Sequence, residues 1–86
     1  MIYKQTLELR DKLYADINRE IEDECHVGAF FQATSWLKML ARVKRDFACS
    51  DAMINEINVL VGVLHNVITE SKSRIDIVDQ IAAGIE

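Results

Sequence analysis

The sequence predicts an all-α protein, a three-helix bundle whose long C-terminal helix carries a heptad seam and joins copies of the chain into an oligomer. The chain of 86 residues has no proline and only three glycines, and without Asn-Gly or Asp-Gly turns or sustained alternation it does not favour β-hairpins. Hydrophobic residues make up 50% of the chain, which argues against disorder. Apolar residues after position 54 recur in steps of three and four, which is typical of helices packed on helices.

The length predicts a single helical domain over residues 1–86, with helices over about 2–24, 29–47 and 51–85. A chain this short buries only about 60–65% of the surface that its unfolded form exposes. Stability is then marginal, and oligomerisation is the expected source of additional buried surface.

The first predicted helix is amphipathic and ends in a cluster of acids. Its apolar stripe, widened by Leu7 and Tyr14, consists of Ile2, Leu9, Leu13, Ile17 and Ile21. We expect Gly28 to adopt the left-handed conformation that closes a helix. Four acids crowd this end, where the macrodipole disfavours negative charge by about 0.3–1 kcal/mol per group: Glu20, Glu22, Asp23 and Glu24. Such a cluster requires a structural reason.

The second predicted helix is the most hydrophobic and should form the core. One side carries Phe30, Ala33, Leu37, Leu40 and Phe47, with Ala29, Trp36 and Val43 beside them. Its polar strip is narrow and is flanked by Phe31 and Met39. This pattern predicts a helix that is covered on more than one side.

The third predicted helix begins at Ser50, whose hydroxyl can cap the backbone N–H groups, with Asp51 in the first turn. At 1.5 Å per residue it would be about 54 Å long and the other two about 30 Å, so roughly half of it would overhang. A break near 70–73, where Ser73 and Asp76 resemble a capping pair, would instead create a fourth helix. The seam keeps its phase across this stretch, which favours a continuous helix.

The heptad seam of this helix is the main functional signal. It comprises Ile54, Ile57, Val61, Leu64, Ile68, Ser71, Ile75, Val78, Ala82 and Ile85. A mean step of about 3.5 residues keeps such a stripe on one side only if the helix supercoils around a partner. A second stripe runs beside it through Met53, Leu60, Val67 and Ile81, with Arg74 interrupting it.

We expect residues 53–68 to pack on the first two helices and residues 75–85 to pack on another copy or another protein. The predicted oligomer or partner interface consists of Ile54, Ile57, Val61, Leu64, Ile68, Ile75, Val78 and Ile85. Isoleucine at both seam positions tends to favour more than two strands.

The net charge of −4 is divided unevenly along the chain. Residues 1–26 hold four basic and seven acidic side chains, residues 27–47 hold four and one, and residues 48–86 hold two and six. A basic middle helix between two acidic ones indicates charge complementarity within the bundle or between subunits. Its cations could also contact a polyanion, with Phe31 and Trp36 nearby for stacking: Lys38, Arg42, Lys44 and Arg45. The acidic total and the lack of a helix-turn-helix pattern do not favour nucleic acid.

Residues that could bind metal lack the usual spacing. Cys25, His26, Cys49 and His65 have suitable side chains for zinc, and the first three could meet at one end of an up-and-down bundle, but no short-spaced pair exists. The acids Glu20, Asp23 and Glu24, with Glu56, resemble carboxylate clusters that hold magnesium, although only the first helix supplies a pair. There is no HExxH and no phosphate-binding glycine loop. We therefore predict no metal, no cofactor and no enzymatic activity.

The expected function is protein binding by an adaptor, small chaperone or inhibitor whose partners are itself and another protein. The alternatives are a nucleic-acid-associated regulator that uses the basic face, a metal-dependent hydrolase, and a small-ligand sponge at an oligomer interface. Charges interrupt the apolar stretches and the N-terminus lacks the pattern of a signal peptide, so we expect a cytoplasmic protein without membrane contact. The two cysteines suit reduced thiols.

Overall fold

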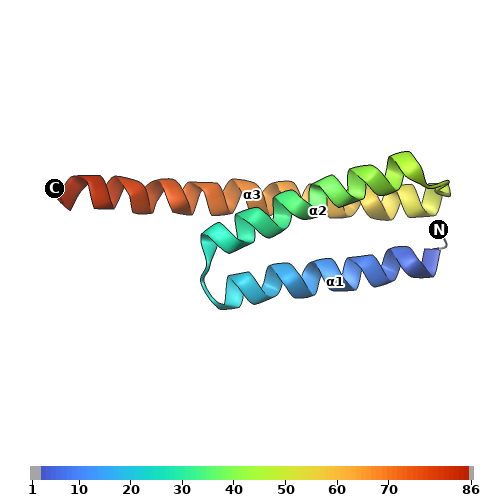
Figure 1. Ribbon diagram of the computed structural model, residues 1–86, viewed down its shortest axis with the longest axis horizontal. Helices are drawn as coiled ribbons and strands as arrows, with labels where there is room; N and C mark the ends of the chain where they lie inside the picture. The colour runs from blue at the N-terminus through green and yellow to red at the C-terminus, as the bar shows by residue number, and fades with distance from the viewer. Residues whose placement is uncertain (1–2, 86) are drawn as a thin grey trace.

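The computed structural model describes the backbone of residues 3–85 and the side chains of residues 3–76. Its three helices are α1 (Tyr3–Glu22), α2 (His26–Asp46) and α3 (Asp51–Ile85). They run up, down and up, with α2 antiparallel to both neighbours (Figure 1). The described residues contain no strand, so the predicted all-helical bundle is confirmed.

The third helix is continuous through residues 69–73 and determines the length of the molecule. Its 35 residues span about 52 Å at 1.5 Å per residue, and the molecule measures 54 × 21 × 16 Å. The turn between α1 and α2 lies beside Ser71 and Arg74. Beyond this point, residues 75–85 extend past the other two helices (Figure 1). We call this segment the overhang. It is about a third of α3 rather than the expected half, because the turn reaches further along α3 than the helix lengths suggested.

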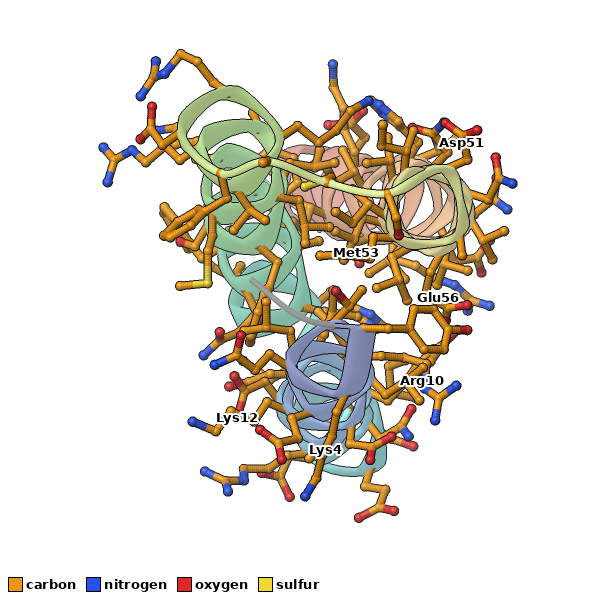
Figure 2. All side chains as sticks on the ribbon, turned by 90° about the vertical axis from the view of Figure 1, so that its right-hand side faces the viewer. Lys4, Arg10, Lys12, Asp51, Met53 and Glu56 are labelled. Atoms are coloured by element: carbon orange, nitrogen blue, oxygen red, sulfur yellow. The ribbon has the colours of Figure 1, made fainter. Side chains whose placement is uncertain are left out.

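The core lies where the three helices meet. Figure 2, a view along the bundle, shows α1 lying against the space between α2 and α3. The buried cluster contains Leu13, Ile17, Ala33, Trp36, Leu40, Val43, Ile57, Leu60 and Leu64. Phe30 and Leu37, predicted at the centre of the α2 core face, are only half-buried, and Phe47 is exposed. The α2 core is thus centred on Trp36 and Leu40, because α1 and α3 both cover that side.

Along α1 the predicted stripe is only partly correct. Leu13 and Ile17 are buried, but Ile21 is 55% exposed because it lies at the end of the helix beside an open hollow. Thr6 is buried and was not expected in the core. Ile2 lies outside the described residues.

The connection between α1 and α2 corrects the prediction for Gly28. No described glycine has a positive φ, and Gly28 lies inside the first turn of α2. The left-handed residue is Glu24, with φ 55°. The Cys25 N–H donates to the Glu20 carbonyl at 2.9 Å and the Glu24 N–H donates to the Ile21 carbonyl at 3.0 Å. This pair of bonds is the Schellman motif that ends α1.

This short turn explains why acidic residues are tolerated at the C-terminal end of α1. The turn brings the C-terminal end of α1 beside the N-terminal end of α2, where the macrodipole favours negative charge. A Cβ on Gly28 would collide with the Glu20 carboxylate and would lie 2.9 Å from the Cys25 Sγ. Glycine at position 28 therefore allows the Glu20 carboxylate to approach the first turn of α2.

The start of α3 follows the prediction. The Met53 N–H donates to the Ser50 hydroxyl at 3.3 Å, and the Ile54 N–H donates to the Ser50 carbonyl at 3.0 Å. The predicted cap at Ser50 is thus confirmed. The preceding loop leaves α2 through Phe47, which is in extended conformation with φ −120° and ψ 144°.

One described helix, α3 over Asp51–Asp76, is long and apolar enough to span a membrane by length and composition alone. The expectation that charges interrupt every apolar stretch was too strict, because residues 57–69 carry no charged side chain. In the bundle, Met53, Ile57, Leu60 and Leu64 of this helix are buried, while Asn58, His65 and Asn66 are exposed.

Candidate functional site

The predicted seam alternates between core and surface. Ile57, Leu64 and Ser71, spaced seven residues apart, are buried in the protomer, and Ser71 is only 4% exposed. The other seam positions are half-buried, also at seven-residue spacing: Ile54, Val61, Ile68 and Ile75. We call these four residues the half-buried line. Ile57 and Leu64 were included in the predicted interface, but both are fully buried in the protomer and cannot contact a partner. Val78 and Ile85 lie outside the residues whose side chains are described.

One residue of the half-buried line, Val61, lines an open groove between α2 and α3. Val61 and His65 line it from α3, and Leu37 and Ala41 line it from α2, around a cavity of about 560 Å³ with Lys44 and Arg45 at its edge. We call this feature the α2–α3 groove. At about 100° per residue, His65 lies half a turn around α3 from Glu56. Glu56 faces α1, where its carboxylate lies 3.7 Å from the Arg10 guanidinium (Figure 2). The groove therefore opens on the side of α3 that is turned away from α1.

A second hollow of about 610 Å³ lies where the α1–α2 turn meets α3. Its lining mixes acids, polar groups and apolar side chains: Glu20, Ile21, Glu24, Cys25, His26, Ala29, Asn66, Val67, Glu70, Ser71 and Arg74. The Arg74 guanidinium lies 3.2 Å from the Glu70 carboxylate. The overhang begins at this hollow.

The predicted polyanion contacts do not form one surface with Trp36. Trp36 is 7% exposed, and its Nε1–H donates to the Asp16 Oδ2 at 3.1 Å. It is thus a core residue that links α2 to α1. Lys44 turns toward α3, where its Nζ donates to the Asn58 Oδ1 at 2.9 Å.

The other three cations lie on the outer side of α2. At about 100° per residue, Lys38, Arg42 and Arg45 share this side with Phe31, which is 64% exposed. Arg45 forms an ion pair with Asp46, its Nε lying 2.9 Å from the Asp46 Oδ1. The result is a small basic face with one exposed aromatic ring.

The candidate metal ligands are dispersed. Cys25 and His26 lie at the start of α2, whereas Cys49 follows its end, so the length of α2, 21 residues or about 31 Å, separates them. The expectation that the three could meet was wrong because successive turns of an up-and-down bundle lie at opposite ends. Glu56 pairs with Arg10 near the other end of α1 from Glu20, Asp23 and Glu24. Among the described residues, no group of three His, Cys, Asp or Glu side chains could hold a metal ion.

The division of the seam was visible in the sequence only indirectly. The second stripe of Met53, Leu60 and Val67 runs beside Ile57 and Leu64, so the centre of the apolar face lies between these two rows and not on the seam itself. That offset indicated which seam positions would face the core. No known protein family, curated protein or solved structure matches this chain.

Proposed function

We propose that this protein is a non-enzymatic protein–protein interaction module, an adaptor, small chaperone or inhibitor, that self-associates through the C-terminal part of α3. The observation that carries the proposal is the continuous α3 helix, which extends past the α1–α2 turn as the overhang. The sequence of the overhang keeps the heptad spacing at Ile75, Val78, Ala82 and Ile85.

The energetic argument rests on what the overhang would otherwise expose to water. Ile75, its first residue, is only half-buried by the protomer. Full burial of an isoleucine or valine side chain stabilises by about 1.5–3 kcal/mol. A supercoiled partner helix would bury the whole seam row of the overhang. Association thus adds apolar burial that a chain of 86 residues does not obtain alone.

A matched pair of double variants tests the proposal. Val78→Glu with Ile85→Glu places two charges on the seam, and Gln80→Glu with Ala83→Glu places the same number of new carboxylates at positions off the seam. We expect the natural chain and the off-seam variant to be multimers, and the seam variant to be monomeric. Light scattering over a hundredfold dilution measures the molar mass.

Either of two results would overturn self-association through α3. The natural chain could be a monomer at every concentration, or the seam and off-seam variants could have the same mass. Circular dichroism of the seam variant is the accompanying control. Native helicity there would show that a lower mass reflects lost association and not unfolding.

The basic face of α2 supports a second candidate, a nucleic-acid-associated regulator. Lys38, Arg42 and Arg45 are exposed beside Phe31. Binding through these cations would weaken steeply as salt rises and would be lost in the Arg42→Glu, Arg45→Glu double variant. Fluorescence anisotropy with labelled single- and double-stranded DNA and RNA at several salt concentrations measures this. Arg42 lies outside the α2–α3 groove, so the single variant Arg42→Glu should weaken nucleic-acid binding without changing the molar mass.

A further inference from the structure

We infer that the α2–α3 groove is occupied by a second copy of this chain, so that groove and overhang form one continuous interface. This inference rests on the proposed self-association and specifies how the two copies lie. The four-helix layer so formed contains α2 and α3 from each copy, with each α1 on the outside. The groove, the half-buried line and the overhang together carry the argument.

Residues on both sides of the groove belong to seven-residue repeats. On α3, Val61 lines the groove and belongs to the half-buried line, and on α2, Leu37 and Lys44 line it and continue the spacing from Phe30. Phe30 and Leu37 are also half-buried, and the small exposed Ala41 lies between Leu37 and Lys44. Residues spaced by seven stay in line only along helices that supercoil around a partner. The occupant that fits these two walls is therefore helical and has the same repeat.

Continuity with the overhang selects a second copy as that occupant. The half-buried line reaches Ile75, where the overhang begins, and the sequence continues it at Ala82. A partner helix that lies along the overhang and keeps its register enters the groove without a break. The α3 helix of another copy has both the repeat and the 35-residue length for this path.

The same continuity determines the symmetry of the pair. A two-fold axis parallel to α3 brings both overhangs to the same end, where each covers the other, and sets α2 of one copy against α3 of its partner. An antiparallel two-fold would leave the overhangs at opposite ends of the dimer. The parallel arrangement also brings Lys44 and Arg45 at the groove edge toward a partner α3 helix that carries Asp51 near the same level, within about 40° of His65 on a helical projection.

A charge placed in the groove tests this inference separately from the proposed function. Ala41 and Ser35 are both exposed on α2, but only Ala41 lines the groove. We expect Ala41→Glu to weaken association at least tenfold in dilution experiments and Ser35→Glu to leave it unchanged. If the seam variant of the overhang dissociates while Ala41→Glu does not, the groove assignment is wrong and self-association through the overhang stands. If neither variant dissociates, both proposals fail.

Cross-linking tests which helices of the two copies face each other. In a chain carrying Cys25→Ser and Cys49→Ser, two single-cysteine variants are made, Ala41→Cys and Val61→Cys, because these positions face each other across the groove. With a short bis-maleimide, the parallel two-fold predicts covalent dimers in the mixture of the two variants and few with Ala41→Cys alone. Efficient dimers from Ala41→Cys alone would mean that α2 faces α2, and would overturn the pairing of α2 with the partner α3.

Discussion

At the scale of single residues, Glu24 has the most unusual backbone conformation in the described part of the chain. It takes the left-handed conformation, with φ 55°, that glycine adopts without steric cost. Its place in the Schellman motif is set by the hydrogen bonds of Glu24 and Cys25 to the end of α1. The sequence predicted that Gly28 would be the left-handed residue. Gly28 instead lies in the first turn of α2, where the absence of a Cβ allows the Glu20 carboxylate to approach. Backbone strain is thus present at Glu24, whereas Gly28 allows close packing.

Replacing Glu24 with glycine should therefore stabilise the protein. We expect Glu24→Gly to raise the free energy of unfolding by about 0.5–1 kcal/mol, because glycine has no Cβ to crowd the following carbonyl oxygen in the left-handed conformation. Glu22→Gly is the matched control: Glu22 is the last residue of α1 and does not have a positive φ, so glycine there relieves no strain and only makes the unfolded chain more flexible, which lowers stability by about 0.4–1 kcal/mol. Urea denaturation followed by circular dichroism measures both. A destabilised Glu24→Gly variant would show that the carboxylate matters more than the backbone.

Residue-scale features were predictable only where the signal was local. The cap at Ser50 was found because a serine hydroxyl serves the backbone three residues away. The link from Trp36 to Asp16 joins residues 20 positions apart and depends on how α1 and α2 pack. Thr6 was missed for the same reason, since its burial depends on its neighbours in space and not on its own polarity.

At the scale of elements, periodicity identified all three helices but not the exact orientation of their faces. The apolar spacing of α3 predicted a helix that continues through residues 69–73, as found. It did not distinguish positions buried by α1 and α2 from positions open to a partner, because both require the same apolar side chains. Ile57 and Val61 are four residues apart on one seam, yet one is buried in the core and the other borders a groove.

The directions in which the three helices run decide which of the candidate metal ligands can meet. The zinc and magnesium hypotheses combined residues from several helices, but they placed some of these residues at the wrong end of the bundle. The up-and-down arrangement separates Cys49 from Cys25 and His26 by the whole of α2, and it places Glu56 beside Arg10. Residue types can suggest a site, but only the topology decides which of them meet.

At the scale of the whole molecule, the elongated shape provides a large surface for the proposed self-association. A molecule of 54 × 21 × 16 Å has a high ratio of surface to volume, and the buried core lies between the three helices, before the overhang. Stability contributed by a partner depends on concentration through mass action. The proposed self-association therefore predicts a folded state that is more stable in concentrated than in dilute solution.

Thermal unfolding gives the corresponding prediction. For a dimer that unfolds to separate chains, a hundredfold increase in concentration adds about 2.7 kcal/mol of stability per dimer, which should raise Tm by about 5–10 °C. The seam variant with Val78→Glu and Ile85→Glu should melt at a lower temperature that does not change with concentration. The off-seam variant with Gln80→Glu and Ala83→Glu should behave like the natural chain. Circular dichroism in cells of different path length covers the concentration range. A constant Tm for the natural chain would mean that the three helices are stable without a partner, and the overhang would then contribute nothing to folding.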